Sequence, residues 1–416
     1  MGLRDEHLAV LHARARELDL PRYRMLPRDE LIELLEERGA GSEDVVAKEV
    51  AAPAATAETE ALPEEAGGGA EAASEVVTGV LDRMPQGYGF LRLGGLEESE
   101  GDVYVSASQI RRCELRPGDE VSGPARPPRR GERHRALIRV ESVNGQSPEE
   151  ERTHFEDLTP APPTRRLLAA DAAGDPLVRA VDLLGPLAFG QRVLIVAQPR
   201  SGRTTLLRAL GGEISRTGAQ VCVVLGDARP EEVPQWRRAL PDAEIFAATA
   251  DQELRDQVRE AELAMGHAKR LAESGQDVVV LIDSLSRLAL GYRDPGRVKR
   301  VFGAGRELDG EGGSLTVIAT VLDSDDRGAE VRAALETTEN LLLRLDAGLA
   351  AKGVVPALVA ADCRASGEDA LRDPEELEKV RRLRAELAEM DPEQAARSLA
   401  DRIAATASNA ELLARL

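Results

Sequence analysis

The segment Ala197–Thr205 constrains the fold of this chain more than any other. It reads Ala-Gln-Pro-Arg-Ser-Gly-Arg-Thr-Thr and directly follows the apolar run Val193–Val196. A loop of this kind between a buried strand and a helix is typical of the phosphate loop, G-x-x-x-x-G-K-[ST], of nucleotide-binding proteins. Gly202 and Thr204 stand at the expected positions. We therefore expect backbone N–H groups to hold phosphates and the Thr204 hydroxyl to reach Mg²⁺.

Two residues depart from that pattern. Ala197 replaces the first glycine, and Arg203 replaces the lysine. Arginine is a wide planar fork and lysine a compact point charge, so the second exchange alters a crowded phosphate site. The segment predicts the architecture of an NTPase and leaves hydrolysis open. The nucleotide-binding residues predicted in this loop are Arg200, Ser201, Gly202, Arg203, Thr204 and Thr205.

Apolar runs spaced by helical patterns flank this loop. Strands that alternate with helices predict a parallel sheet covered on both faces, as in α/β P-loop domains. Asp283 ends one of these runs, where a carboxylate can hold Mg²⁺ through water. The tail from Pro374 onward predicts helices with one apolar, core-facing stripe. The predicted strands are 193–196, 221–225, 278–282, 315–319 and 341–345, and the stripe is Leu377, Val380, Leu383 and Leu387.

The rest of the chain predicts further domains. Residues 41–76 carry no aromatic side chain and are rich in Ala, Glu, Pro and Gly, so they cannot bury enough surface to fold. Five short alternating strands between 77 and 145 predict a small OB-type barrel. The predicted organisation is a helical subdomain at 1–40, a disordered linker at 41–76, an OB or cold-shock-like barrel at 77–145, a connector at 146–165 and a RecA-like P-loop domain with a helical tail at 166–416.

Charge and cysteine content narrow the choice of partners. The net charge is −20, which argues against indiscriminate nucleic-acid binding. Nine arginines nevertheless lie between Arg111 and Arg139, so we expect any contact with a polyanion there. The three cysteines are far apart, and the sequence shows neither a leader nor a long apolar run. These features predict a cytoplasmic protein with no membrane partner.

Aromatic residues gather in the predicted barrel although they make up only 2% of the chain. Tyr88 and Phe90 share one face of a strand because side chains alternate, and Arg92 continues that row. Tyr104 lies on the next predicted strand. Rows of rings and cations on small barrels bind single-stranded nucleic acid by stacking. The alternative is that these rings fill the core of the barrel.

The same segments resemble the family of the bacterial transcription terminator Rho. Gly87–Leu91, Asp102–Ser106 and Gly131–Arg133 look like its cold-shock-type RNA-binding domain, and the basic segment Ser108–Arg112 continues the match. His134 stands where the family usually has an aromatic residue. The resemblance implies binding of pyrimidine-rich RNA. The implied RNA-binding residues are Tyr88, Phe90, Arg92, Asp102, Tyr104, Arg111, Arg112, Glu132 and Arg133.

The resemblance extends through the P-loop domain. Asp227–Val233, Leu281–Ala289 and Glu311–Thr316 look specific to Rho, whose own phosphate loop begins with alanine. It implies a hexameric ring in a transcription complex, with ATP and Mg²⁺ as cofactors. Arg229 joins the implied nucleotide site, and Thr204 and Asp283 become the implied Mg²⁺ residues.

Several family positions are altered. The glutamate that polarises the attacking water corresponds to Ala228, and the aromatic residue that stacks on adenine corresponds to Val355. Loss of a positioned base typically costs about 10²–10⁴ in rate. The stretch between Tyr292 and Phe302 is shorter than the family's pore loop, and a second pore element carries Glu336. An anion there should repel RNA.

Three interpretations follow. The first is a Rho-type termination factor that captures nascent RNA, binds ATP weakly, and has weakened hydrolysis and translocation. The second is a working ATP-dependent RNA translocase with rewired residues. The third is a non-catalytic RNA-binding regulator, or a partner subunit in a mixed ring with an active Rho. None of the catalytic positions is intact in this comparison, since Ala228 replaces the base.

Overall fold

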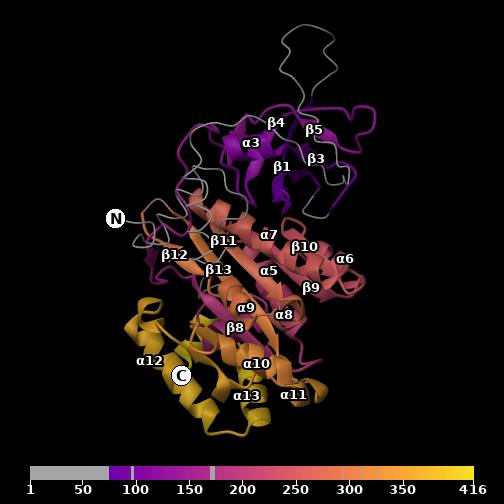
Figure 1. The fold of residues 1–416 in the computed structure, drawn as a ribbon. Coiled ribbons are helices and arrows are strands. Elements are labelled where there is room, and N and C mark those ends of the chain that lie inside the picture. Colours follow the sequence, from indigo (N-terminus) through magenta and orange to yellow (C-terminus); the bar gives the residue numbers. More distant parts are fainter. Residues whose placement is uncertain (1–74, 95–97, 169–173, 293, 311, 325) are drawn as a thin grey trace, which may run out of the picture. The chain divides into compact units, whose positions relative to one another are not determined.

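The computed structural model describes residues 75–94, 98–168, 174–292, 294–310, 312–324 and 326–416 (Figure 1). The helices predicted for 1–40 lie outside the described residues. So does the linker predicted for 41–76, except for its last two residues, which begin the first strand of the barrel. All described residues belong to one compact unit.

The N-terminal part of that unit is a closed barrel. Its strands follow the order β1-β2-β3-β5-β4, and β1 also pairs with β4, which closes the barrel, while β6 extends β4. Leu81, Leu91 and Val103 are fully buried inside it. The five predicted strands are therefore confirmed. The elements are β1 (Glu75–Arg83), β2 (Gly89–Arg92), β3 (Val103–Val105), α3 (Ala107–Arg112), β4 (Glu120–Arg126), β5 (Arg135–Leu137) and β6 (Ser142–Val143).

The second part is built on a sheet with strand order β10-β9-β11-β13-β8-β14-β15. Neighbours in this order are parallel except the edge pair β14–β15, and β12 and β7 add antiparallel pairings beside β13. The predicted parallel sheet and its five strands are confirmed, and β10 was not predicted. The strands are β7 (Pro160–Ala161), β8 (Arg192–Ala197), β9 (Gln220–Ala228), β10 (Glu244–Thr249), β11 (Asp277–Asp283), β12 (Arg306–Leu308), β13 (Ser314–Leu322), β14 (Leu341–Leu345) and β15 (Arg364–Ala365).

Helices cover both faces of this sheet (Figure 1). Along β8, Val193 and Ile195 belong to one core cluster, whereas Leu194 and Val196 belong to the other. The first cluster packs against α4 (Pro176–Leu184), α5 (Arg203–Ser215), α6 (Glu232–Ala239), α11 (Ala347–Ala351), α12 (Pro374–Ala388), α13 (Pro392–Ala404) and α14 (Asn409–Ala414). The second packs against α7 (Leu254–Glu273), α8 (Leu285–Gly291), α9 (Pro295–Phe302) and α10 (Asp326–Leu335).

The C-terminal tail is helical, as predicted. Leu377, Val380, Leu383 and Leu387 of α12 are all buried, and the last three belong to the first cluster. Two short 3-10 helices, Ala360–Asp362 and Glu368–Ala370, precede it. Among the described residues, no helix is both long and apolar enough to cross a membrane.

Helix α7 packs against the sheet and also contacts the barrel. Gly118 of the barrel approaches it so closely that an added Cβ would lie 2.3 Å from the His267 backbone nitrogen. The His267 ring lies 3.0 Å from the Gly118 carbonyl oxygen and 3.2 Å from the Glu244 carboxylate of β10. Arg116 of the barrel donates to Glu273 at the end of α7, with 2.9 Å between Nη2 and Oε2.

Candidate functional site

Three aromatic side chains lie together on the outside of the barrel. Strand pairing sets Phe90 opposite Tyr104. The ring centroids of Tyr88 and Phe90 are 5.8 Å apart, and those of Tyr88 and Tyr104 are 5.6 Å apart. Tyr104 is 37% exposed, and the other two rings are half-buried. The rings therefore form a surface platform and do not fill the barrel core.

A groove runs beside this platform. Its walls combine ring surfaces, an apolar side chain and cations, a mixture suited to unstacked bases and their phosphates. Sequence reasoning did not assign Ile138, which is 48% exposed, to RNA binding. The groove is lined by Phe90, Tyr104, Ser106, Ser108, Gln109, Arg112, Arg126, Glu132, Arg133, His134, Ala136, Leu137 and Ile138.

Glu132 is fixed at the edge of the groove. Arg126 donates to both of its carboxylate oxygens, over 2.6 and 2.8 Å, and the Arg129 backbone N–H donates over 2.8 Å. The hydrogen bonds from Arg126 and Arg129 lower the pKa of Glu132 to about 2. The carboxylate is therefore ionised at any physiological pH, and its position is set by Arg126, a residue that the sequence analysis did not single out.

Arg92 and Asp102 lie in the interior and do not extend the exposed row. Arg92 is 4% exposed and donates to Asp82 and to Asp102, which is 1% exposed. Burial disfavours the charge of Arg92, but Asp82 and Asp102 outweigh it and raise its pKa. Arg259 of α7 also donates to Asp82, over 2.9 Å. The predicted RNA contacts of Arg92 and Asp102 thus have no exposed surface here, because buried carboxylates surround Arg92.

The remaining predicted RNA residues are exposed. Arg111 and Arg112 end α3, and Arg133 lies in the loop before β5. Arg112 and Arg133 line the groove, whereas Arg111 does not. RNA binding by all these residues stays a prediction.

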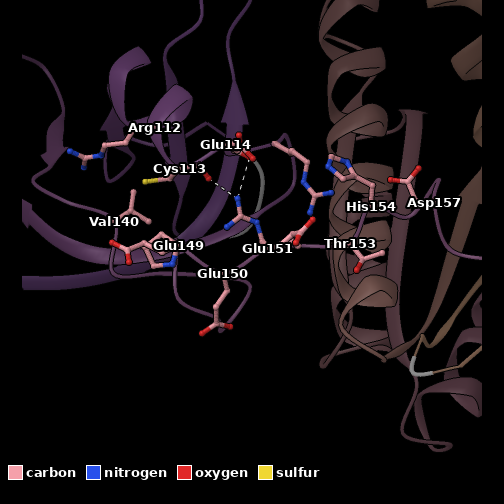
Figure 2. Close-up of a pocket in the computed structure, with 13 residues that line it drawn as sticks. Arg112, Cys113, Glu114, Val140, Glu149, Glu150, Glu151, Thr153, His154 and Asp157 are labelled. Atoms are coloured by element: carbon pink, nitrogen blue, oxygen red, sulfur yellow. Dashed lines mark hydrogen bonds between the residues drawn. The ribbon is translucent and has the colours of Figure 1, made fainter.

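A second hollow lies beside the end of α3 (Figure 2). Arg152 closes one side by donating to the backbone carbonyl oxygens of Cys113 and Glu114. Carboxylates outnumber cations around it, so it is a poor match for a polyanion. Its charged lining consists of Glu114, Glu149, Glu150, Glu151 and Asp157 against Arg112, Arg116, Arg152 and His154.

The phosphate loop has the expected backbone. Gly202 caps α5 with a φ of 89°, a left-handed conformation that suits glycine, and Arg200 also has a positive φ of 65°. Ser201 is buried and donates its hydroxyl to the Gln198 carbonyl oxygen over 2.7 Å. Arg200, Gly202 and Thr205 are exposed. The start of α5 therefore presents free N–H groups and a positive dipole end, the elements of an anion site.

Asp283 is the centre of the predicted Mg²⁺ site. Thr204 Oγ1 donates to its Oδ2 over 2.7 Å, and Thr320 Oγ1 donates to its Oδ1 over 3.1 Å. Arg203 also contacts Oδ1, with Nε 3.1 Å away. The structure brings the two predicted metal residues together, and it adds the guanidinium to the same carboxylate.

Ala228 ends β9 beside this site and is 4% exposed. Arg229 follows it and points its guanidinium at Glu232, with 2.7 Å between Nη2 and Oε1. Arg229 and Glu232 both line a hollow next to Thr204. Its lining comprises Thr204, Arg208, Arg229, Glu231, Glu232, Gln235 and Trp236. Sequence reasoning missed Glu231 and Glu232 as carboxylates on the same hollow as the phosphate loop.

The other altered positions have clear locations. Val355 is 63% exposed and offers no ring for stacking. The stretch between Tyr292 and Phe302, expected as a short pore loop, is mostly helix α9, and Glu336 is exposed just after α10.

Two family models match the chain. Residues 77–149 match the model described as Rho termination factor, RNA-binding domain. Residues 178–304 match the model described as ATP synthase alpha/beta family, nucleotide-binding domain. These matches cover the barrel and the part of the sheet domain that contains the phosphate loop and Asp283.

Three curated relatives of this chain share one name. A Bacillus subtilis (strain 168) protein named transcription termination factor Rho is 40% identical over 329 residues, 73% of this chain and 76% of the relative. The Aquifex aeolicus (strain VF5) protein of that name is 38% identical over 81% of this chain and 84% of its own. The Streptomyces lividans protein of that name is 39% identical over 82% of this chain, which spans only 51% of that relative.

Among solved structures, this chain is similar to an ATPase from the type III secretion system of pathogenic bacteria. The superposition covers 62% of this chain and 82% of the ATPase chain. Its TM-score is 0.45 at 21% identity, too low to support an argument.

Proposed function

The chain belongs to the family of transcription termination factor Rho, and we propose on that premise that it captures single-stranded RNA with its barrel and binds ATP at its phosphate loop while hydrolysing it slowly or not at all. The proposed RNA is pyrimidine-rich and nascent, so the protein would act in the cytoplasm with the transcription complex. Its proposed assembly is a ring, either a homohexamer or a mixed ring with an active Rho.

The ring platform is the observation that carries the RNA-binding proposal. Three aromatic side chains meet outside the barrel, and Tyr104 is 37% exposed. Exposed aromatic rings contribute little to the core, and their contact with water is unfavourable. Stacking of a base on such a ring stabilises binding by about 1–3 kcal/mol per base. The Phe90 ring also lies 5.0 Å from the imidazole of His134, centroid to centroid, so His134 supplies a fourth planar surface.

Slow hydrolysis rests on the nucleotide site. The positive end of α5, Thr204 and Asp283 support phosphate binding. Ala228 has no group that can orient the attacking water. The nearby Glu232 is engaged with Arg229. Weak ATP binding is proposed as well, since Val355 cannot stack on the base.

The direct test measures binding by the full-length protein over a series of salt concentrations. We expect labelled oligocytidine to bind more tightly than the same sequence in a duplex, with affinity that falls as salt rises. Labelled ATP should bind the same preparation. Failure of oligocytidine to bind would reject the RNA proposal, whatever the nucleotide result.

The second candidate is a non-catalytic partner subunit of an active Rho. The observation that favours it is the loss of the base at Ala228 together with an intact barrel and sheet. A mixture with a catalytic Rho should then form rings that contain both chains, measured by native mass spectrometry. Separate rings alone would reject this candidate.

A further inference from the structure

The carboxylate that should serve a metal ion already has a cation beside it. Arg203 places Nε 3.1 Å from Asp283 Oδ1, while the same oxygen accepts the Thr320 hydroxyl over 3.1 Å. The other oxygen accepts the Thr204 hydroxyl over 2.7 Å. A carboxylate offers about four lone-pair sites, and these two hydrogen bonds use two of them while the guanidinium stands beside Oδ1. Asp283 is 8% exposed, so these contacts are poorly screened by water.

This arrangement fits Mg²⁺ badly. Magnesium requires octahedral oxygen coordination at about 2.0–2.1 Å and usually keeps several waters. A water between the metal and Asp283 would have to share Oδ1 with Arg203 and Thr320, or Oδ2 with Thr204. The fixed guanidinium would also repel a divalent cation at short range. Among the described residues, no group of three or more His, Cys, Asp or Glu side chains converges to replace the lost capacity.

The same guanidinium has a donor left over. Within the described part of the chain, Arg203 Nη1 is buried and has no hydrogen-bond partner. Arg203 is also the first residue of α5, directly after Gly202, whose left-handed backbone opens the anion site. A phosphate oxygen at the helix terminus is the acceptor that such a donor needs, and guanidinium groups bind phosphates in a fork geometry.

We propose that Arg203 takes the place of the metal ion, so that this chain binds nucleoside triphosphate with little dependence on Mg²⁺. The inference rests on the proposed nucleotide site and goes beyond it by naming the bound species as the metal-free nucleotide. Arg203 then neutralises the phosphates, and the Asp283 carboxylate competes with them for the guanidinium. The proposal also gives a reason for an arginine in this loop. A lysine has a single side-chain nitrogen, so a lysine held by Asp283 would have no second nitrogen to offer a phosphate.

The test compares the affinity of the full-length protein for a fluorescent ATP analogue in Mg²⁺ and in EDTA. We expect the dissociation constant of the unaltered protein to change by less than about threefold, and that of Arg203→Lys to rise by about tenfold or more in EDTA. Arg216→Lys is the matched control. It makes the same exchange at the far end of α5, where Arg216 contacts Glu213, and should behave like the unaltered protein.

Asp283→Asn gives a second, independent readout. Because the change releases Arg203, binding in EDTA should be unchanged or tighter, whereas a metal site would lose affinity in Mg²⁺. A tenfold or larger loss in EDTA for the unaltered protein, or equal ratios for the unaltered protein and Arg203→Lys, would overturn the inference. Absence of nucleotide binding in both solutions would also overturn it. Oligocytidine binding in the same preparation separates that outcome from failure of the RNA proposal, and thermal unfolding shows that each variant is folded.

Discussion

The barrel and the phosphate-loop region each match a family model, yet they differ in the side chains that they offer for chemistry. In the barrel, Tyr88, Phe90 and Tyr104 meet at the surface, and Arg112 and Arg133 lie along the adjoining groove. In the sheet domain, the strand, loop and helix stand in place, but Ala228 offers no side-chain base and Arg203 contacts the Asp283 carboxylate.

That difference shows that a scaffold and its chemistry are held by different residues. Side chains such as Val193 and Leu194, which are buried on the two faces of the sheet, maintain it, and neither of these two lines the hollow beside Thr204. Ala228 is a small apolar residue at a position that is 4% exposed, so it places no charge in the core. The proposed weakening of the motor is therefore compatible with an intact sheet domain.

The largest expected effect is a gain of hydrolysis. Ala228→Glu combined with Arg203→Lys should raise ATP turnover by about 10²–10⁴-fold, because a positioned base is restored. The single change Arg203→Lys is the control and should give little of this gain. Phosphate release in a steady-state assay measures the rate. No gain in the double variant would mean that the missing base at Ala228 does not limit ATP turnover.

The next effect concerns stability of the barrel. Arg92→Ala removes the cation between Asp82 and Asp102 and leaves buried carboxylates without their main partner. We expect the free energy of unfolding to fall by about 3–5 kcal/mol, measured by denaturant titration. Arg130→Ala, at an exposed arginine of the same domain, should change it little. Weakened RNA binding at unchanged stability would instead make Arg92 an RNA contact.

A smaller effect is expected for stacking. Phe90→Ala should weaken oligocytidine binding by about 1–3 kcal/mol without altering ATP binding. Val355→Ala, at an exposed apolar residue of the other domain, should leave RNA affinity unchanged. Fluorescence anisotropy of labelled RNA measures both. Equal affinities of the two variants would return the rings to a structural role.

The smallest effect is a pH dependence at the junction of the two regions. Burial lowers the pKa of His267, but the hydrogen bond and charge of Glu244 outweigh it and raise the pKa above the ordinary 6.5. The protonated ring therefore stabilises the fold fully below pH 6.5, and this contribution is lost as pH rises through the raised pKa. Unfolding free energy should decline over that window, and His267→Gln should flatten the decline. An identical pH profile in that variant would contradict this assignment.

Much of the fold could be predicted from sequence, because local patterns determine it. The alternation in 89–92 and the apolar runs at 193–196 and 278–282 mark β2, β8 and β11 within one or two residues. Strand β10 was missed because Glu244–Thr249 carries only two large apolar side chains, those of Ile245 and Phe246. The short strands β7, β12 and β15 escape any periodicity, since each pairs over only two or three residues.

The candidate sites were predictable in part. The rings follow from strand alternation, but the burial of Arg92 depends on Asp82, on a neighbouring strand, and on Arg259, which lies 167 positions further along the chain (259 − 92). The contact of Arg203 with Asp283 is also between residues far apart in the sequence, because Arg203 lies on α5 and Asp283 on β11. Long-range pairs of this kind leave no pattern in a single sequence.

The most direct test of the contrast between the regions measures ATP turnover while RNA is bound. The unaltered full-length protein is saturated with labelled oligocytidine, its occupancy is followed by anisotropy, and phosphate release is recorded in the same sample. We predict full RNA occupancy with turnover at least about 10²-fold below the ~1–100 s⁻¹ of ordinary phosphoryl-transfer enzymes. Turnover within that range, or ATP-driven displacement of an RNA–DNA hybrid, would contradict the account and identify a working motor.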